Sequence, residues 1–119
     1  MVSAAVVRIT DYRRARPDQS FTRSELNRLL GLYATRVMRG EWRDYAINHS
    51  PDGASFFIYR SSFERPLFEI SKLSPGKKNT SRTRAGRYVV TTRQEKLAQG
   101  HSLDDVLKVL ERTITLVTA

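Results

Sequence analysis

The segment from residue 41 to residue 73 most constrains the fold, because its strand-like stretches are joined by links too short for a crossover helix. Residues 41–48, 54–60 and 66–73 are rich in aromatic and aliphatic side chains that favour extended structure. The first link contains Pro51 and Gly53, which are typical turn residues. Parallel strands need a connection of roughly a dozen residues or more. These stretches are therefore predicted to form an antiparallel meander.

Helical patterns flank this meander on both sides. Thr22 and Glu25 have the spacing of a capping box, and apolar residues then recur at helical spacing as far as Gly40. This pattern predicts a helix over residues 23–39, ended by the glycine. A second apolar stripe begins after Ser102 and predicts a final helix, while the β-branched residues at 113–117 leave open a last strand.

Between the meander and the final helix, residues 87–92 (RYVVTT) predict a fourth strand. Residues 94–99 fit either a short fifth strand or a helical turn, and propensity does not decide between them. The predicted fold class is α+β: an antiparallel sheet of four to five strands flanked by two helices, in the order α-β-β-β-β-(β)-α. Residues 21–119 are predicted to form a single domain after a flexible basic N-terminal arm over residues 1–20.

Positive charge is concentrated in one part of the chain. Lys and Arg number 21 against 12 Asp and Glu, which gives a net charge of +9. No acidic residue lies between Ile70 and Gln94, whereas that stretch contains Lys72, Lys77, Lys78, Arg82, Arg84, Arg87 and Arg93. We call residues 74–87 the basic loop; their Gly, Pro, Ser and Thr content predicts a mobile segment. Concentrated positive charge attracts polyanions more effectively than the same charge dispersed.

The basic loop predicts a non-enzymatic nucleic-acid-binding accessory protein that contacts the phosphate backbone. The candidate nucleic-acid-binding residues are Lys77, Lys78, Arg82, Arg84 and Arg87. No helix-turn-helix, zinc-finger or ribonucleoprotein signature is present, so base-specific readout is not predicted. The sequence does not distinguish DNA from RNA. A solvated loop that only keeps the protein soluble remains the competing interpretation.

Aromatic residues of the meander support an alternative function as a regulatory protein-interaction module. Trp42, Tyr45, Phe57 and Tyr59 are candidates for an exposed aromatic surface that binds a protein partner or a second copy of the chain. The competing interpretation is that Trp42 or Tyr45 packs beneath the first helix, since aromatics in so small a domain are mostly core residues.

Other classes of function find little support in the sequence. There is no cysteine, which excludes disulfides and thiol chemistry. His49 and His101 are not at metal-binding spacing, and no nucleophile elbow is present, so we expect no metal, no cofactor and no catalytic residues. No apolar run approaches the roughly 18 residues of a membrane span, and a cytoplasmic location without a membrane partner is expected.

Sequence stretches in the meander and the final helix resemble a known family. They are Gly40-Glu41-Trp42-Arg43-Asp44-Tyr45-Ala46, the turn from Tyr59-Arg60 to Glu64-Arg65-Pro66-Leu67, and residues 100–111 (GHSLDDVLKVLE). In this order the chain resembles a family of small alphaproteobacterial proteins known only as a domain of unknown function. The resemblance covers roughly residues 21–111 and implies a bacterial, cytosolic origin. It brings no activity, cofactor or catalytic residue, and the basic loop falls between the resembling stretches.

Overall fold

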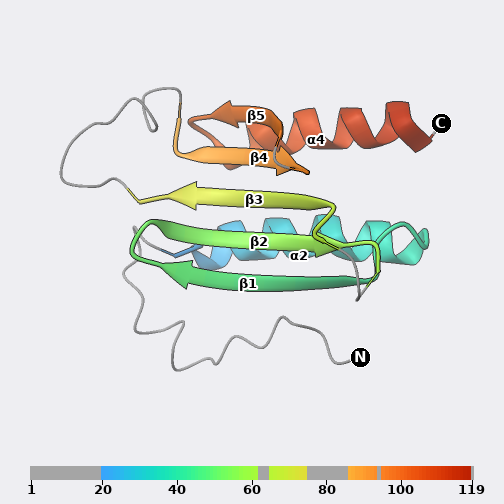
Figure 1. Cartoon of the computed structure of the whole chain (residues 1–119), viewed down its shortest axis with the longest axis horizontal. Coiled ribbons are helices and arrows are strands. Elements are labelled where there is room, and N and C mark those ends of the chain that lie inside the picture. The colour runs from blue at the N-terminus through green and yellow to red at the C-terminus, as the bar shows by residue number, and fades with distance from the viewer. Residues whose placement is uncertain (1–19, 62–64, 75–85, 94, 119) are drawn as a thin grey trace.

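The structure is a computed structural model that describes residues 20–61, 65–74, 86–93 and 95–118 (Figure 1). Within these ranges, helix, strands and helix follow in the predicted α-β-β-β-β-β-α order, which confirms the α+β fold class. The elements are α2 (Arg23–Met38), β1 (Asp44–Ser50), β2 (Gly53–Tyr59), β3 (Phe68–Leu73), β4 (Tyr88–Thr92), β5 (Glu95–Gly100) and α4 (Leu103–Thr118). The predicted arm and most of the basic loop lie outside the described residues.

Helix α2 begins and ends at the residues that its sequence signals predict. The Thr22 side chain accepts a hydrogen bond from the Glu25 backbone N–H, and the Glu25 carboxylate accepts one from the Thr22 backbone N–H, so the capping box is formed. At the other end Arg39 is the C-cap, and Gly40 follows with φ of 75°. The positive φ is accessible to glycine at little cost, which explains why the helix stops there.

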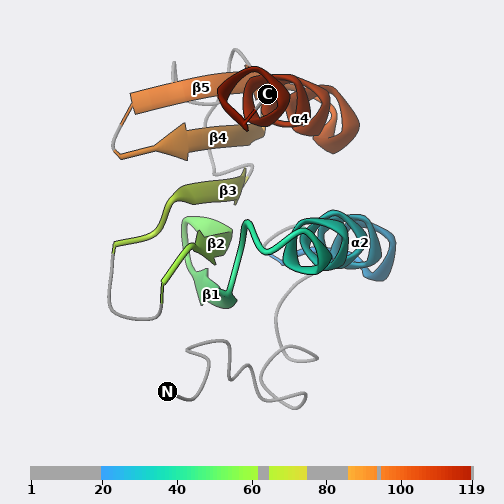
Figure 2. The ribbon, with the colours of Figure 1, turned by 90° about the vertical axis from the view of Figure 1, so that its right-hand side faces the viewer.

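The described strands form one antiparallel sheet in the order β1-β2-β3-β4-β5. Figure 2 shows α2 and α4 side by side on the same face of this sheet. The core lies between that face and the helices, and its fully buried side chains include Phe56, Ile58, Ile70, Val90 and Leu107. No described helix is long and apolar enough to cross a membrane.

The two ambiguous segments of the sequence are resolved by packing rather than by propensity. Residues 95–100 form strand β5 because they pair with β4, from Tyr88 opposite Gly100 to Thr92 opposite Glu95. The suggested last strand at 113–117 is wrong, because α4 continues to Thr118. Ile114 is 4% exposed on the helix's apolar stripe, and the Thr113 hydroxyl donates to the Val109 carbonyl one turn earlier. This bond makes a β-branched residue compatible with a helix.

Close approach of strands β2 and β3 requires a glycine at the start of β2. Gly53 has φ of 134°, and a Cβ atom there would lie 2.0 Å from the Lys72 carbonyl oxygen. That oxygen belongs to backbone, which cannot move aside as a flexible side chain could. Gly31 provides the contrast, because it lies within α2 and a Cβ there would meet no heavy atom within 4 Å apart from its chain neighbours and the backbone of its own helix.

We predict opposite effects on stability for alanine at these two glycines. Gly53→Ala should lower the free energy of unfolding by more than about 2 kcal/mol, because positive-φ strain costs on the order of 1–3 kcal/mol before the clash is added. Gly31→Ala should raise it by about 0.5–1 kcal/mol, the usual gain for alanine within a helix. Urea unfolding followed by the fluorescence of Trp42, the single tryptophan, measures both. Equal effects at the two positions would contradict this placement of the strands.

Candidate functional site

The described residues that flank the basic loop lie at one end of the sheet. We call this the loop end; Gly53, Leu73, Tyr88 and Gly100 mark it in neighbouring strands. The Leu73 backbone donates to the Arg87 carbonyl at 2.7 Å, and Arg87 Nε donates back to the Leu73 carbonyl at 3.0 Å. Both strands that lead into the loop are therefore fastened together at its base.

Four of the five predicted nucleic-acid-binding residues, namely Lys77, Lys78, Arg82 and Arg84, lie outside the described residues. Arg87 is described, and its hydrogen bond to Leu73 gives it a structural contact at the base of the loop. Its guanidinium has further hydrogen-bonding nitrogens besides Nε. The sequence placed all five in one group, whereas the structure sets Arg87 apart as a residue that fastens β4 to β3.

Helices α2 and α4 both begin at the loop end (Figure 1). The start of α4 follows directly from β5, whose last residue Gly100 pairs with Tyr88. Helix N-termini carry partial positive charge from their unpaired backbone N–H groups. Acidic residues of the first turns, Glu25 in α2 and Asp104 and Asp105 in α4, offset part of it.

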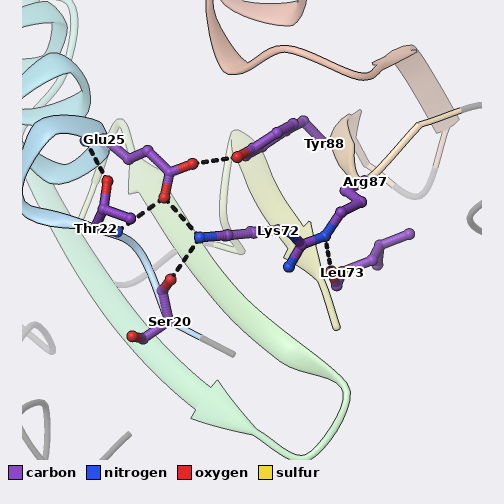
Figure 3. A network of polar contacts seen from close by, with 7 residues as sticks. All are labelled: Ser20, Thr22, Glu25, Lys72, Leu73, Arg87 and Tyr88. Atoms are coloured by element: carbon purple, nitrogen blue, oxygen red, sulfur yellow. Dashed lines mark hydrogen bonds and ion pairs between the residues drawn. The ribbon is translucent and has the colours of Figure 1, made fainter. Parts of the chain in front are cut away.

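A buried lysine connects α2 to the sheet at the loop end (Figure 3). Lys72 is 3% exposed, and its Nζ donates to Glu25 Oε1 and to the Ser20 carbonyl oxygen, each at 2.8 Å. The second carboxylate oxygen of Glu25 accepts a hydrogen bond from the Tyr88 hydroxyl. We call Lys72, Glu25 and Tyr88 the buried cluster. A lysine is almost never fully buried unless it is paired, and here the pairing is with a carboxylate and a carbonyl.

These contacts shift the pKa values of Glu25 and Tyr88. Burial raises the pKa of Glu25, but hydrogen bonds from Lys72, Tyr88 and the Thr22 backbone outweigh it and hold that pKa below its ordinary value. Burial, followed by the hydrogen bond to Glu25, raises the pKa of Tyr88 to about 12. At neutral pH Glu25 is therefore charged and Tyr88 is a neutral donor, which is the combination that the hydrogen bond requires.

A cleft of about 630 Å³ opens next to the buried cluster, between the first turns of α2 and α4. Ser24, Asn27, Tyr88, His101 and Ser102 supply polar groups to its lining. Arg28 also lines it and bridges the helices: its Nε lies 3.0 Å from Asp104 Oδ1 and its Nη2 lies 3.0 Å from Glu111 Oε1. The cleft is thus polar, with its arginine already engaged by two carboxylates.

The four residues of the predicted aromatic surface do not form one surface. Trp42 is 2% exposed and lies in the core, with its ring centroid 6.1 Å from that of Phe68. Tyr45 stacks on buried Phe56 at 5.3 Å, because strand pairing places it opposite Ile58 on the helix-covered face. For these two residues, packing beneath the helices was the correct interpretation.

Phe57 and Tyr59 lie on the opposite face, which neither described helix covers (Figure 2). Both are half-buried. Glu69 lies opposite Phe57 in the neighbouring strand and accepts a hydrogen bond from Ser71 at 2.9 Å. Burial, followed by the charges of Asp44 and Glu69, raises the pKa of Tyr59. We call this surface the open face; Asp44 and Glu69 place negative charge near Tyr59.

A comparison with protein families shows which family the chain belongs to. The family described as "protein of unknown function (DUF2794)" matches residues 19–107. The chain belongs to this family. The match confirms the resemblance to a domain of unknown function, and in this DUF2794 protein it extends from just before α2 into α4, so that it includes the buried cluster and the cleft. No curated protein and no solved structure matches the chain.

The structure adds residues that sequence reasoning missed. Lys72 was counted with the basic residues available to a polyanion, yet it is buried in the described fold. Its position was foreseeable, because it continues the alternation of Phe68 and Ile70 on the core face.

Among the described residues, no group of three or more His, Asp or Glu side chains is placed to hold a metal ion.

We predict that the buried cluster is a major source of stability. Lys72→Met should lower the free energy of unfolding by on the order of 3 kcal/mol, because it leaves the buried Glu25 carboxylate without its cation. The double variant Glu25→Gln/Lys72→Met should lose less free energy of unfolding than the single variants Glu25→Gln and Lys72→Met lose when their losses are added. Urea unfolding of all four proteins measures the coupling, and strictly additive losses would contradict the ion pair.

The lowered pKa of Glu25 also predicts a pH dependence. A carboxylate with a depressed folded-state pKa stabilises the fold above its ordinary value of 4.5, and that contribution is lost as the pH falls through the folded-state pKa. Thermal unfolding is measured between pH 7 and pH 2.5. The melting temperature should therefore fall less on acidification in Glu25→Gln than in the wild type. Parallel curves would show that Glu25 does not contribute.

Proposed function

We propose that this protein is a non-enzymatic accessory protein of the cytoplasm that binds nucleic acid through the phosphate contacts of its basic loop. The observation that carries the proposal is the concentration of Lys77, Lys78, Arg82 and Arg84 without an acidic residue, in a loop fastened at the loop end of the sheet. Arginine and lysine are the main phosphate-binding side chains, and neighbouring hydroxyls of the loop add further donors.

The charge of the loop favours an anionic partner. Strand β3 ends and β4 begins near the first turns of α2 and α4, where Glu25, Asp104 and Asp105 offset part of the helix dipoles, so the attraction for an anion comes from the side chains of the loop. Arg87 supports the function by fastening the base of the loop to Leu73. The phosphate contacts are therefore assigned to the other four basic residues of the loop, which are Lys77, Lys78, Arg82 and Arg84.

The open face is a less suitable place for a phosphate backbone. Phe57 and Tyr59 could stack with bases, but Asp44 and Glu69 place negative charge beside Tyr59. This negative charge makes the surface beside Tyr59 less favourable for a phosphate group than the basic loop. The half-buried aromatics on a helix-free face instead favour a second candidate function, a surface for a protein partner or a second copy of the chain. Sedimentation at high salt tests it, because association through apolar contacts should persist where phosphate binding is lost.

We predict that binding of the wild type to labelled oligonucleotides depends steeply on salt. If the four loop cations each neutralise one phosphate, the logarithm of the association constant should fall with the logarithm of salt concentration at a slope of about −3 to −4. The variant with Lys77, Lys78, Arg82 and Arg84 all changed to Ser should lose this binding. Fluorescence anisotropy at low and moderate salt measures both.

The matched control removes the same charge elsewhere. Arg39, Arg43, Arg65 and Arg112 are all exposed and none belongs to the loop end, so the variant that changes these four to Ser has the same net charge as the loop variant. It should keep most of the affinity of the wild type. Equal losses in the two variants would mean that binding follows net charge alone, and the proposal would then fail.

A further inference from the structure

The cleft between α2 and α4 differs from the basic loop in charge, and this difference indicates what it binds. The Glu25 carboxylate is paired with Lys72, while Arg28 is paired with Asp104 and Glu111. A phosphate in the cleft would have to displace two carboxylates from Arg28 and would lie close to a third. The charges of the cleft thus favour a neutral ligand over an anion.

The lining of the cleft offers both hydrogen-bond donors and acceptors. Ser24 and Asn27 come from α2 and are exposed, and Ser102 comes from the turn before α4. Hydroxyl and amide groups each donate and accept, as do the edges of a nucleobase. Tyr88 and the exposed His101 add planar rings of the kind on which unpaired bases stack. The volume of about 630 Å³ lies within the range of small-ligand sites.

The cleft also lies next to the base of the basic loop. Two residues of the cleft are next in the chain to residues at the base of the loop: Tyr88 follows Arg87, and His101 follows Gly100. The backbones of Gly86 and Gly100 pack so closely that a Cβ atom on Gly86 would lie 2.1 Å from the Gly100 carbonyl. Gly86 and Arg87 are the described residues at which the chain returns from the loop. A nucleic acid bound at this described base of the loop would therefore bring its bases close to the cleft.

We propose that this cleft binds one unpaired nucleobase of a single strand whose phosphates contact the basic loop. The inference rests on the proposed function and specifies its substrate class, because a base in a duplex is stacked and paired and cannot enter. The protein is then a single-strand binder. Its loop supplies salt-dependent affinity, and its cleft supplies the preference for single strands over duplexes.

The experiment compares three labelled ligands at one salt concentration: a 12-nucleotide single strand, the matching duplex, and the same strand with every base removed. Wild-type protein should bind the intact single strand about tenfold more tightly than the abasic strand, the usual scale for stacking of one base. The DNA and RNA versions of the strand are both measured. Equal affinity for the intact and abasic strands would overturn the inference.

The variant Asn27→Ala/His101→Ala removes one hydrogen-bonding group and one ring from the cleft. Both side chains are exposed, so the fold should survive, and circular dichroism with urea unfolding verifies this. Binding to the intact strand should fall to the abasic level, while binding to the abasic strand should stay unchanged. The matched control Asn48→Ala changes an exposed residue of edge strand β1 and should behave as the wild type.

The outcomes separate this inference from the proposed function. If Asn27→Ala/His101→Ala binds the intact strand as tightly as the wild type while the four-serine loop variant loses binding, the cleft has no role and phosphate binding by the loop stands. If the loop variant binds every ligand as the wild type does, both proposals fall.

Discussion

The buried contact between Lys72 and Glu25 is the interaction on which the loop end depends. One carboxylate accepts hydrogen bonds from the Thr22 backbone, from Lys72 and from Tyr88, so it caps α2, compensates a buried cation and holds the start of β4. A cation on the core face of a sheet is unfavourable unless an acid reaches it. The first turn of α2 must therefore lie over the end of β3, and this placement forms one wall of the cleft.

The distribution of charge divides the molecule into regions with different chemistry. The helix-covered face contains the apolar core, and its buried cluster is internally compensated. The open face has half-buried aromatics near Asp44 and Glu69. The sequence of the basic loop contains basic residues and no acidic residue, and its described ends lie at the end of the sheet where the two helices begin. Phosphate binding at the loop and base binding in the neighbouring polar cleft would use this division, because each chemical part of a nucleic acid meets groups that suit it.

Local signals in the sequence predicted most of the fold, whereas residues governed by long-range contacts were harder to place. The capping box of Thr22 and Glu25 and the short links of the meander act within a few residues, so both predictions were confirmed. Strand β5 and the continuation of α4 past Thr113 depend on pairing with β4 and on packing against the sheet, which propensity does not report. Likewise, nothing local shows that Glu25 lies beside Lys72, 47 residues away in the chain. The cleft could not be predicted, because it forms only where two helix starts and β4 meet.

We expect nucleic acid to bind at the loop end and not on the open face. The most direct measurement is the change in backbone amide resonances of isotopically labelled protein on titration with a single-stranded oligonucleotide. We expect the affected resonances to belong to the basic loop, to the start of α2 including Asn27, and to the turn before α4 that contains His101. Changes confined to the open face around Phe57, Tyr59 and Glu69 would contradict it.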